Sequence, residues 1–172
     1  MSMNEQKPPK VQIIPPRTEL KQRAVNFTKG FDINLGPEQL EELERVVQRS
    51  SDAFVRSIGH DLSETRQLVI NAITNADLRP KAVEKSADLA YSTKALGGTF
   101  DYPLMTQIAK SLEVFLHGRS TANKRQLMVT QLHIDAIYVI LASRITGFGT
   151  SIEQATTVAL SKIAARYSDP RE

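Results

Sequence analysis

A tyrosine, a lysine and two small residues stand at helical spacing in the middle of the chain. They are Tyr91, Lys94, Ala95 and Gly98. The spacing i, i+3, i+4, i+7 places them on one face of a helix, where a polar ring, a cation and small side chains leave room for an acidic loop of another protein. Gly97 precedes Gly98, and each glycine costs a helix about 0.5–1 kcal/mol relative to alanine. A helix tolerates this cost where another part of the backbone, a loop or a partner must approach closely, so we expect such an approach at Gly97 and Gly98.

The stretch 89–104 resembles the signature of histidine phosphotransfer (Hpt) domains, in versions that read roughly A-H-D-x-K-G-x-G-G-T-F-G-Y-P-L. The positions that match in register are Ala90, Lys94, Gly97, Gly98, Thr99, Phe100, Tyr102, Pro103 and Leu104. Weaker likeness extends to 108–112, 132–136, 147–149 and the Ile-Ile-Pro-Pro stretch near the N-terminus. The resemblance covers most of the chain, although only 91–104 is strongly diagnostic.

The resemblance implies a helical bundle that relays phosphate between aspartates of response-regulator receiver domains. The phosphate-accepting histidine of the family stands where this chain has Tyr91. The family lysine that helps to neutralise the phosphoryl group corresponds to Lys94. Two glycines of the family are replaced here, by Ala95 and Asp101.

Tyr91 is a poor chemical substitute for the missing histidine. An imidazole is substantially neutral and nucleophilic near pH 7, whereas a phenol loses its proton only near about pH 10. A phosphotyrosine ester is also a much poorer phosphoryl donor than phosphohistidine. Ser92 and Thr93 lie about 100° and 200° away around a helix, so they do not replace Tyr91. We therefore expect a face that docks a partner without carrying phosphate, and no catalytic residue.

The three histidines suggest no second site. His60 stands in a Gly-His-Asp-Leu sequence that faintly resembles the phosphoacceptor box of histidine-kinase dimerisation helices, without the basic residue and proline that normally follow. His117 precedes a glycine at a predicted helix end, and His133 is expected at the edge of the core. The histidines form no i, i+4 pair and have no clustered carboxylates, so neither a metal site nor a cofactor is expected. No Ser-His-Asp set or phosphate-binding glycine loop is present.

The composition narrows the function classes further. Aromatic residues make up 6% and tryptophan is absent, which suits an aliphatic helical bundle better than a sandwich or barrel. The net charge of +3 comes from scattered residues rather than a basic stripe, so nucleic-acid binding is not expected. The absence of cysteine excludes disulfides and thiolate chemistry. No apolar run approaches the roughly 20 residues of a membrane span, and no signal-peptide core is apparent, so a cytoplasmic, non-membrane protein is expected.

Helical periodicity accounts for the chain after Gly36. Residues 1–36 are rich in Pro, Lys and polar residues, and their two Pro-Pro pairs predict an extended or partly disordered tail. Apolar spacing then predicts helices over about 37–49, 52–75, 80–97, 103–118, 123–145 and 151–167. The sequence Ser50-Ser51-Asp52 indicates a break and a new cap between the first two, and Thr150 with Glu153 indicates a capping box for the last. Short loops favour antiparallel neighbours.

The sequence therefore predicts an all-α, antiparallel up-and-down helical bundle of Hpt type, built on a four-helix bundle with extra helices and an extended N-terminal tail. Residues 37–168 form the predicted domain. The expected function is a non-catalytic, Hpt-like module of two-component signalling that docks a response-regulator receiver domain or a histidine kinase. The predicted docking residues are Tyr91, Lys94, Ala95, Gly97 and Gly98. Two alternatives stay open: an active phosphorelay protein that uses another residue such as His60, and a purely structural or oligomerising helical domain. Formation of a homo-oligomer also stays open.

Overall fold

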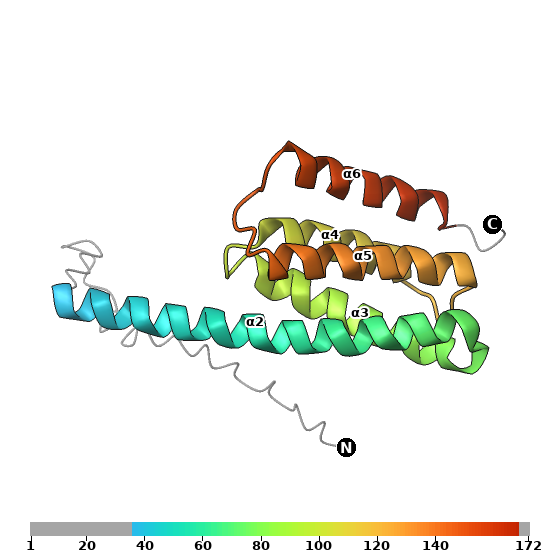
Figure 1. Cartoon of the computed structure of the whole chain (residues 1–172), viewed down its shortest axis with the longest axis horizontal. Helices are drawn as coiled ribbons and strands as arrows, with labels where there is room; N and C mark the ends of the chain where they lie inside the picture. Colours follow the sequence, from blue (N-terminus) through green and yellow to red (C-terminus); the bar gives the residue numbers. More distant parts are fainter. Residues whose placement is uncertain (1–35, 169–172) are drawn as a thin grey trace, which may run out of the picture. The chain divides into compact units, whose positions relative to one another are not determined.

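The computed structural model describes residues 36–168, and the regular structure of this part of the chain is entirely helical, which confirms the all-α prediction. The elements are α2 (Pro37–Thr74), the short 3-10 helix η1 (Ala76–Leu78), α3 (Arg79–Gly97), α4 (Pro103–Leu116), α5 (Lys124–Ala142) and α6 (Ser151–Arg166) (Figure 1). The predicted tail over 1–36 lies outside the described residues except for Gly36. The chain divides into two compact units, 1–43 and 44–172, and the sites described below belong to the second.

α2 is one uninterrupted helix, so the predicted break at Ser50-Ser51-Asp52 is wrong. Ser50 Oγ donates to the carbonyl oxygen of Val46 (2.9 Å), which satisfies the hydroxyl inside the helix. Gln48 Nε2 donates to Asp52 Oδ1 (3.2 Å), an i, i+4 contact that spans the predicted break. Residues that often cap helices are therefore absorbed here by bonds to the preceding turn.

The later helices begin close to where the sequence predicts them. Pro80 and Pro103 lie in the first turns of α3 and α4, where the missing backbone N–H has no helical partner to lose. The predicted capping box of α6 is confirmed, since the Thr150 backbone N donates to Glu153 Oε2 (2.7 Å) while the Thr150 side chain caps the first turn. A second capping box, which the sequence reading did not identify, begins α5.

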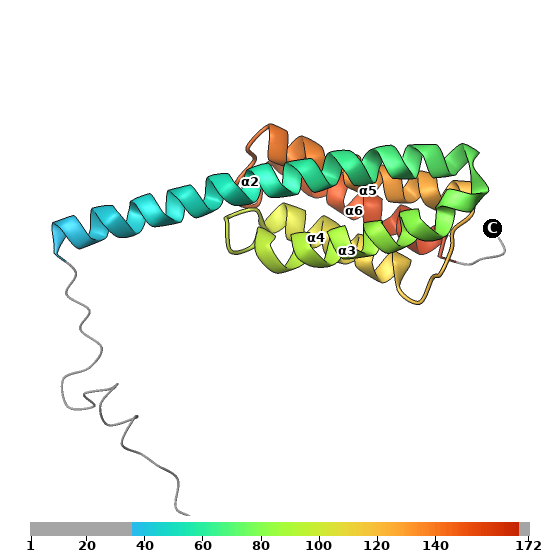
Figure 2. The ribbon, with the colours of Figure 1, turned by 90° about the horizontal axis from the view of Figure 1, so that it is seen from below.

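Contacts between helices show which helices are neighbours in the bundle. α3 and α4 pack against each other through a short turn, and α4 packs against α5. Arg66 of α2 pairs with Asp135 of α5 (Nε to Oδ1, 2.5 Å). From Phe54 onward α2 thus joins α3, α4 and α5 in an antiparallel four-helix arrangement, and α6 lies along α4 and α5 (Figures 1 and 2).

The interior of the arrangement is mainly aliphatic. The largest fully buried side chains include Leu62, Leu104, Met105, Ile108, Leu112, Phe115, Leu127, Ile134 and Ile137. Each fully buried Leu, Ile or Phe contributes about 1.5–3 kcal/mol relative to an exposed one, so this packing dominates the stability of the bundle. Among residues 36–168, no helix combines the length and apolar character that a membrane crossing requires.

His133 is the exception within this apolar interior. It was expected at the edge of the core, but its side chain is fully buried on α5. Its Nδ1 donates to the Val129 carbonyl oxygen (2.8 Å), which leaves Nε2 to accept from Ser111 Oγ (3.1 Å). Burial lowers the pKa of the His133 imidazole, and the hydrogen bond to Val129 only partly opposes this. The imidazole is therefore held neutral at pH 7.

We predict that His133 makes the folded state sensitive to mild acid. An unfolded imidazole takes up a proton near about pH 6.5, while the folded imidazole resists protonation until a lower pH. The unfolded state therefore binds more protons in this window, and the free energy of unfolding falls as the pH drops below about 6.5. Urea denaturation followed by circular dichroism at pH 7.5 and 5.5 measures the fall.

The matched variants are His133→Gln, whose amide does not titrate, and His117→Gln at an exposed position. His133→Gln should remove most of the fall between the two pH values, and His117→Gln should keep it. An unchanged pH dependence in His133→Gln would contradict the role assigned to the buried imidazole.

Candidate functional site

α3 buries one side and exposes the other. The buried residues are Ala82, Val83, Ser86, Leu89, Ala90, Thr93 and Gly97. Tyr91 points to the exposed side, where 65% of it is accessible. Lys94 lies half-buried next to it, with Nζ 5.4 Å from the centroid of the Tyr91 ring, and Ala95 and Gly98 are exposed. The structure therefore brings four of the five predicted residues to one surface.

Lys94 is bound by a carboxylate from the neighbouring helix. Its Nζ donates to both carboxylate oxygens of Glu113 on α4, at 2.6 and 2.7 Å. Each of the two side chains is 31% exposed, so the pair is less screened by water than a fully exposed one. The cation that the resemblance assigns to a phosphoryl group thus already has a counter-charge. We call Tyr91, Lys94, Ala95, Gly98 and Glu113 together the Tyr91 face.

Gly97 differs from the prediction because it is buried at the contact between α3 and α4. A Cβ atom at this position would lie 2.7 Å from Thr106 Oγ1 and 3.2 Å from the Tyr102 carbonyl oxygen. Only glycine therefore allows the two helices to approach so closely. A Cβ at Gly98 would meet Thr106 Oγ1 at 3.8 Å, an ordinary contact. One glycine serves packing, while the other is part of the exposed surface.

The turn between α3 and α4 is fixed by backbone and aromatic contacts. The Tyr102 backbone N donates to the Gly97 carbonyl oxygen (2.8 Å). Phe100 stacks on Phe54 of α2, with ring centroids 4.6 Å apart. Asp101 adopts a φ of +62°, at the position where the Hpt signature has glycine. Aspartate tolerates the left-handed region better than most residues, so it can occupy this position of the turn.

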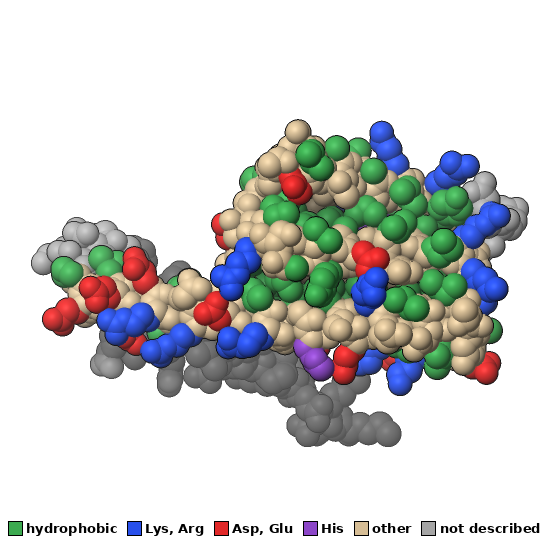
Figure 3. Space-filling view, viewed as in Figure 1, with side chains coloured by type: hydrophobic (Ala, Val, Ile, Leu, Met, Phe, Trp, Pro, Cys, Tyr) green, Lys and Arg blue, Asp and Glu red, His purple; other side chains and the backbone are tan. Residues whose placement is uncertain are grey.

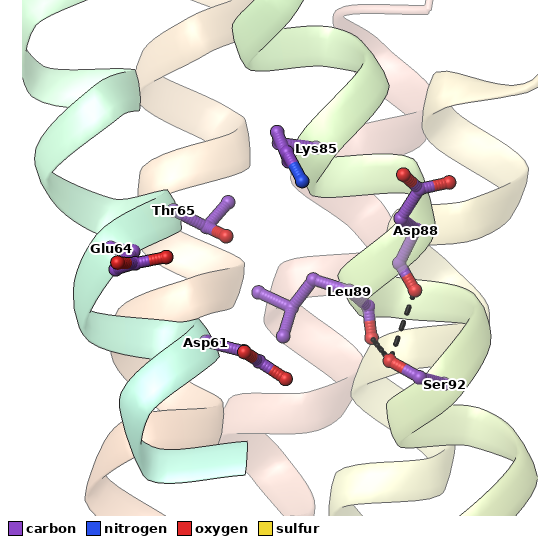
Figure 4. Close-up of a pocket in the computed structure, with 7 residues that line it drawn as sticks. All are labelled: Asp61, Glu64, Thr65, Lys85, Asp88, Leu89 and Ser92. Carbon is purple, nitrogen blue, oxygen red and sulfur yellow. Dashed lines mark hydrogen bonds between the residues drawn. The ribbon is translucent and has the colours of Figure 1, made fainter. Parts of the chain in front are cut away.

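A cavity of about 270 Å³ lies between α2 and α3, and no residue of the Tyr91 face lines it (Figure 4). Its lining residues are Asp61, Glu64, Thr65, Lys85, Asp88, Leu89 and Ser92. Ser92 Oγ donates to the carbonyl oxygens of Asp88 and Leu89, at 3.0 and 3.1 Å (Figure 4). The hydroxyl is thus used within α3. The lining mixes carboxylates with one lysine and provides no base directed at a nucleophile.

The three histidines lie on elements other than α3, which carries Tyr91. His60 is exposed on α2, with Nε2 3.3 Å from Glu64 Oε1. His117 is exposed just after α4, and His133 lies in the core. Within residues 36–168, no group of three His, Asp or Glu side chains is arranged to hold a metal ion.

Comparison with protein-family models, with curated proteins and with solved structures finds no match. The functional interpretation therefore depends on the site residues and on the resemblance of 89–104 to the Hpt signature. Glu113 is the site residue that the sequence reading missed. It stands 19 positions after Lys94, and only the antiparallel register of α3 and α4 brings the two together. The one local signal for that pairing was Pro103. It marks the start of α4 after a short turn, and a short turn makes α3 and α4 antiparallel neighbours.

We predict opposite outcomes for alanine at the two adjacent glycines. Gly97→Ala should lower the free energy of unfolding by about 1–3 kcal/mol, because the added methyl group overpacks the α3–α4 contact. Gly98→Ala should leave stability unchanged or raise it by up to about 1 kcal/mol, because Gly98 has helical φ and ψ of −65° and −32° and an added Cβ would make only an ordinary contact. Urea denaturation measures both. Equal effects of the two substitutions would contradict the assigned packing role.

Proposed function

We propose that this protein is a non-catalytic, Hpt-like docking module that binds a response-regulator receiver domain through the Tyr91 face. The observation that carries the proposal is the Lys94–Glu113 ion pair beside an exposed tyrosine. The cation that would serve a phosphoryl group is already neutralised, and the residue that would accept the phosphoryl group is a phenol. In this proposal the Tyr91 face keeps the exposed side chains that a partner would contact. It lacks the unpaired cation and the imidazole that phosphate transfer needs.

The chemistry of the exposed side chains favours binding to a folded protein. Tyrosine is among the residues that most often dominate binding energy at interfaces, because it buries a large ring and keeps a hydroxyl for hydrogen bonding. Ala95 and Gly98 flank Tyr91 with small surfaces, so a partner loop can approach the backbone of α3. The Lys94–Glu113 pair can be covered at lower cost than an unpaired lysine, because its two charges compensate each other.

The same electrostatics opposes a stable phosphoryl group at position 91. Such a group would carry close to two negative charges near the Glu113 carboxylate, and Lys94 would have to leave that carboxylate to neutralise it. In the proposed role the protein therefore competes with, or holds, a receiver domain and does not pass phosphate to it. A histidine kinase is the other partner class that the resemblance implies, and it serves as the comparison in the binding test.

We predict that Tyr91 contributes strongly to receiver binding. The measurement is isothermal titration calorimetry of the full chain against isolated receiver domains encoded by the same genome, with and without beryllofluoride as a mimic of the phosphorylated aspartate. Tyr91→Ala should weaken binding by about tenfold or more, as expected for a central interface tyrosine. Tyr138→Ala is the matched control, because Tyr138 is a 47% exposed tyrosine on α5. It should leave the dissociation constant unchanged.

Incubation with a phosphorylated receiver domain should leave the wild-type protein unlabelled. Acid-labile label that is lost in His60→Gln would instead identify an active phosphorelay protein. Binding to a kinase dimerisation domain but to no receiver domain would replace the proposed partner. If neither class binds, the docking proposal fails and a structural role is favoured.

A further inference from the structure

A groove lies on the surface between α4 and α6, which are neighbours in the bundle (Figure 1). It consists of two overlapping hollows of about 310 and 410 Å³, which share Gln107, Ser161 and Ala165. Its α4 side runs from Gln107 to Phe115, and its α6 side runs from Thr157 to Ser168. At 1.5 Å per helical residue, the α6 side is about 16 Å long, which is the length of about three turns of another helix. We call this surface the α4–α6 groove.

The α4–α6 groove offers apolar contacts that the bundle itself does not use. Val114 on α4 and Val158 on α6 are 69% and 54% exposed. Ala165 is also exposed, while Phe115 and Ala164 are buried beneath. Large exposed apolar side chains in a groove are typical of a surface that another protein covers.

Two lysines give the groove a positive charge. Lys110 of α4 and Lys162 of α6 are both exposed, and no carboxylate lines either hollow. The single acidic residue of each helix is engaged elsewhere, because Glu113 binds Lys94 and Glu153 caps the start of α6. Within the part of the chain that the structure describes, neither Lys110 nor Lys162 takes part in an ion pair. Charge complementarity therefore favours an acidic occupant.

The hydroxyl groups of the groove are already used within the protein. Ser161 Oγ donates to the Thr157 carbonyl oxygen (3.2 Å), and Ser168 Oγ donates to the Ala164 carbonyl oxygen (2.8 Å). Ser111 Oγ is hydrogen-bonded to His133 Nε2 (3.1 Å). A compact anion needs several converging donors, which these engaged hydroxyls do not supply. Apolar packing together with the two lysines instead suits a larger, partly apolar ligand.

The helical walls of the groove also determine the backbone conformation of its occupant. The backbone groups in the middle of α4 and α6 are paired within their own helices, so they cannot pair with an added strand. An extended peptide would therefore bury backbone N–H and C=O groups without partners. A helix satisfies these groups internally and can pack its side-chain ridge between two other helices.

We propose that the α4–α6 groove binds an acidic amphipathic helix of a partner protein. Its apolar row packs on Val114, Val158 and Ala165, and carboxylates on the two sides of this row meet Lys110 and Lys162. This is a second binding surface, beyond the docking function proposed above. It does not depend on whether a receiver domain binds the Tyr91 face.

Other occupants fit the groove less well. A flat membrane surface does not enter a groove between two helices. A second copy of this chain could offer the exposed first turns of α2, but Glu41 and Glu42 there already have partners, and Arg45 and Arg49 follow them.

The exposed apolar side chains over α5 provide the contrast. Figure 3 shows hydrophobic side chains gathered over α5 and α6 on the side of the molecule drawn there. On α5 the charged residue among them, Asp135, is paired with Arg66. That surface therefore has no charge preference that identifies an occupant, whereas the two lysines of the α4–α6 groove do.

The test measures fluorescence anisotropy of a labelled, hydrocarbon-stapled peptide titrated with the full chain. The peptide is a helix of about 18 residues with leucines at i, i+4, i+7 and i+11 and glutamates on both sides of this row. Val114→Glu should weaken binding by about tenfold or more, because it puts a like charge among the apolar contacts. Val139→Glu is the matched control, since Val139 is a 55% exposed valine on α5, and it should bind normally.

A charge exchange tests the role of the two lysines. A peptide with lysines in place of the glutamates should not bind the wild-type protein. The double variant Lys110→Glu/Lys162→Glu should lose the acidic peptide and gain the lysine peptide. Lys81→Glu is the control, because Lys81 is an exposed lysine of α3 that lies near α2, and it should keep the wild-type preference.

Circular dichroism melting establishes that each variant is folded, since all the altered side chains are exposed. The proposal is overturned if the acidic peptide does not bind, if the lysine peptide binds the wild-type protein equally well, or if Val114→Glu has no effect. It is also overturned if the acidic peptide does not bind while Val114→Glu abolishes a dimer seen by sedimentation or binding to phosphatidylglycerol vesicles.

Discussion

The close approach of α3 and α4 at Gly97 is the constraint on which the candidate site depends. The absence of a side chain lets Thr106 and the Tyr102 backbone lie against the end of α3. That register brings Lys94, one turn earlier, within reach of Glu113 on α4. It also leaves Tyr91 on the outer side of α3. The sequence predicts Gly97 as part of the binding surface. Gly97 instead lies buried at the α3–α4 contact and determines how the residues of that surface are positioned.

In the proposed function, the Lys94–Glu113 pair distinguishes two uses of the Tyr91 face. An exposed, unpaired lysine beside a nucleophile would be suited to stabilising a transferred phosphoryl group. A lysine held at 2.6 and 2.7 Å by both oxygens of a carboxylate has its charge largely compensated. Together with a phenol in place of an imidazole, this pairing favours recognition over transfer.

Local signals in the sequence predicted most of the fold. Pro80, Pro103 and the Thr150–Glu153 box mark helix starts, because their effects involve only neighbouring residues. The break expected at Ser50–Asp52 did not form, because a serine hydroxyl can bond either forward as a cap or back to the preceding turn. The site was less predictable. The helical period placed Tyr91 and Lys94 on one surface, but Glu113 and the buried environment of His133 depend on how distant helices pair, which the local pattern does not specify.

The central claim is that a receiver domain docks on the Tyr91 face without transferring phosphate. Two-dimensional NMR of the ¹⁵N-labelled full chain, titrated with a phosphorylated receiver domain, tests it most directly. The account predicts that shift changes concentrate at Tyr91, Lys94, Ala95 and Gly98 of α3 and around Glu113 of α4, with no signal of a phosphorylated side chain on this protein. Shift changes confined to α5 and α6, or a phosphorylated residue in the labelled chain, would contradict it.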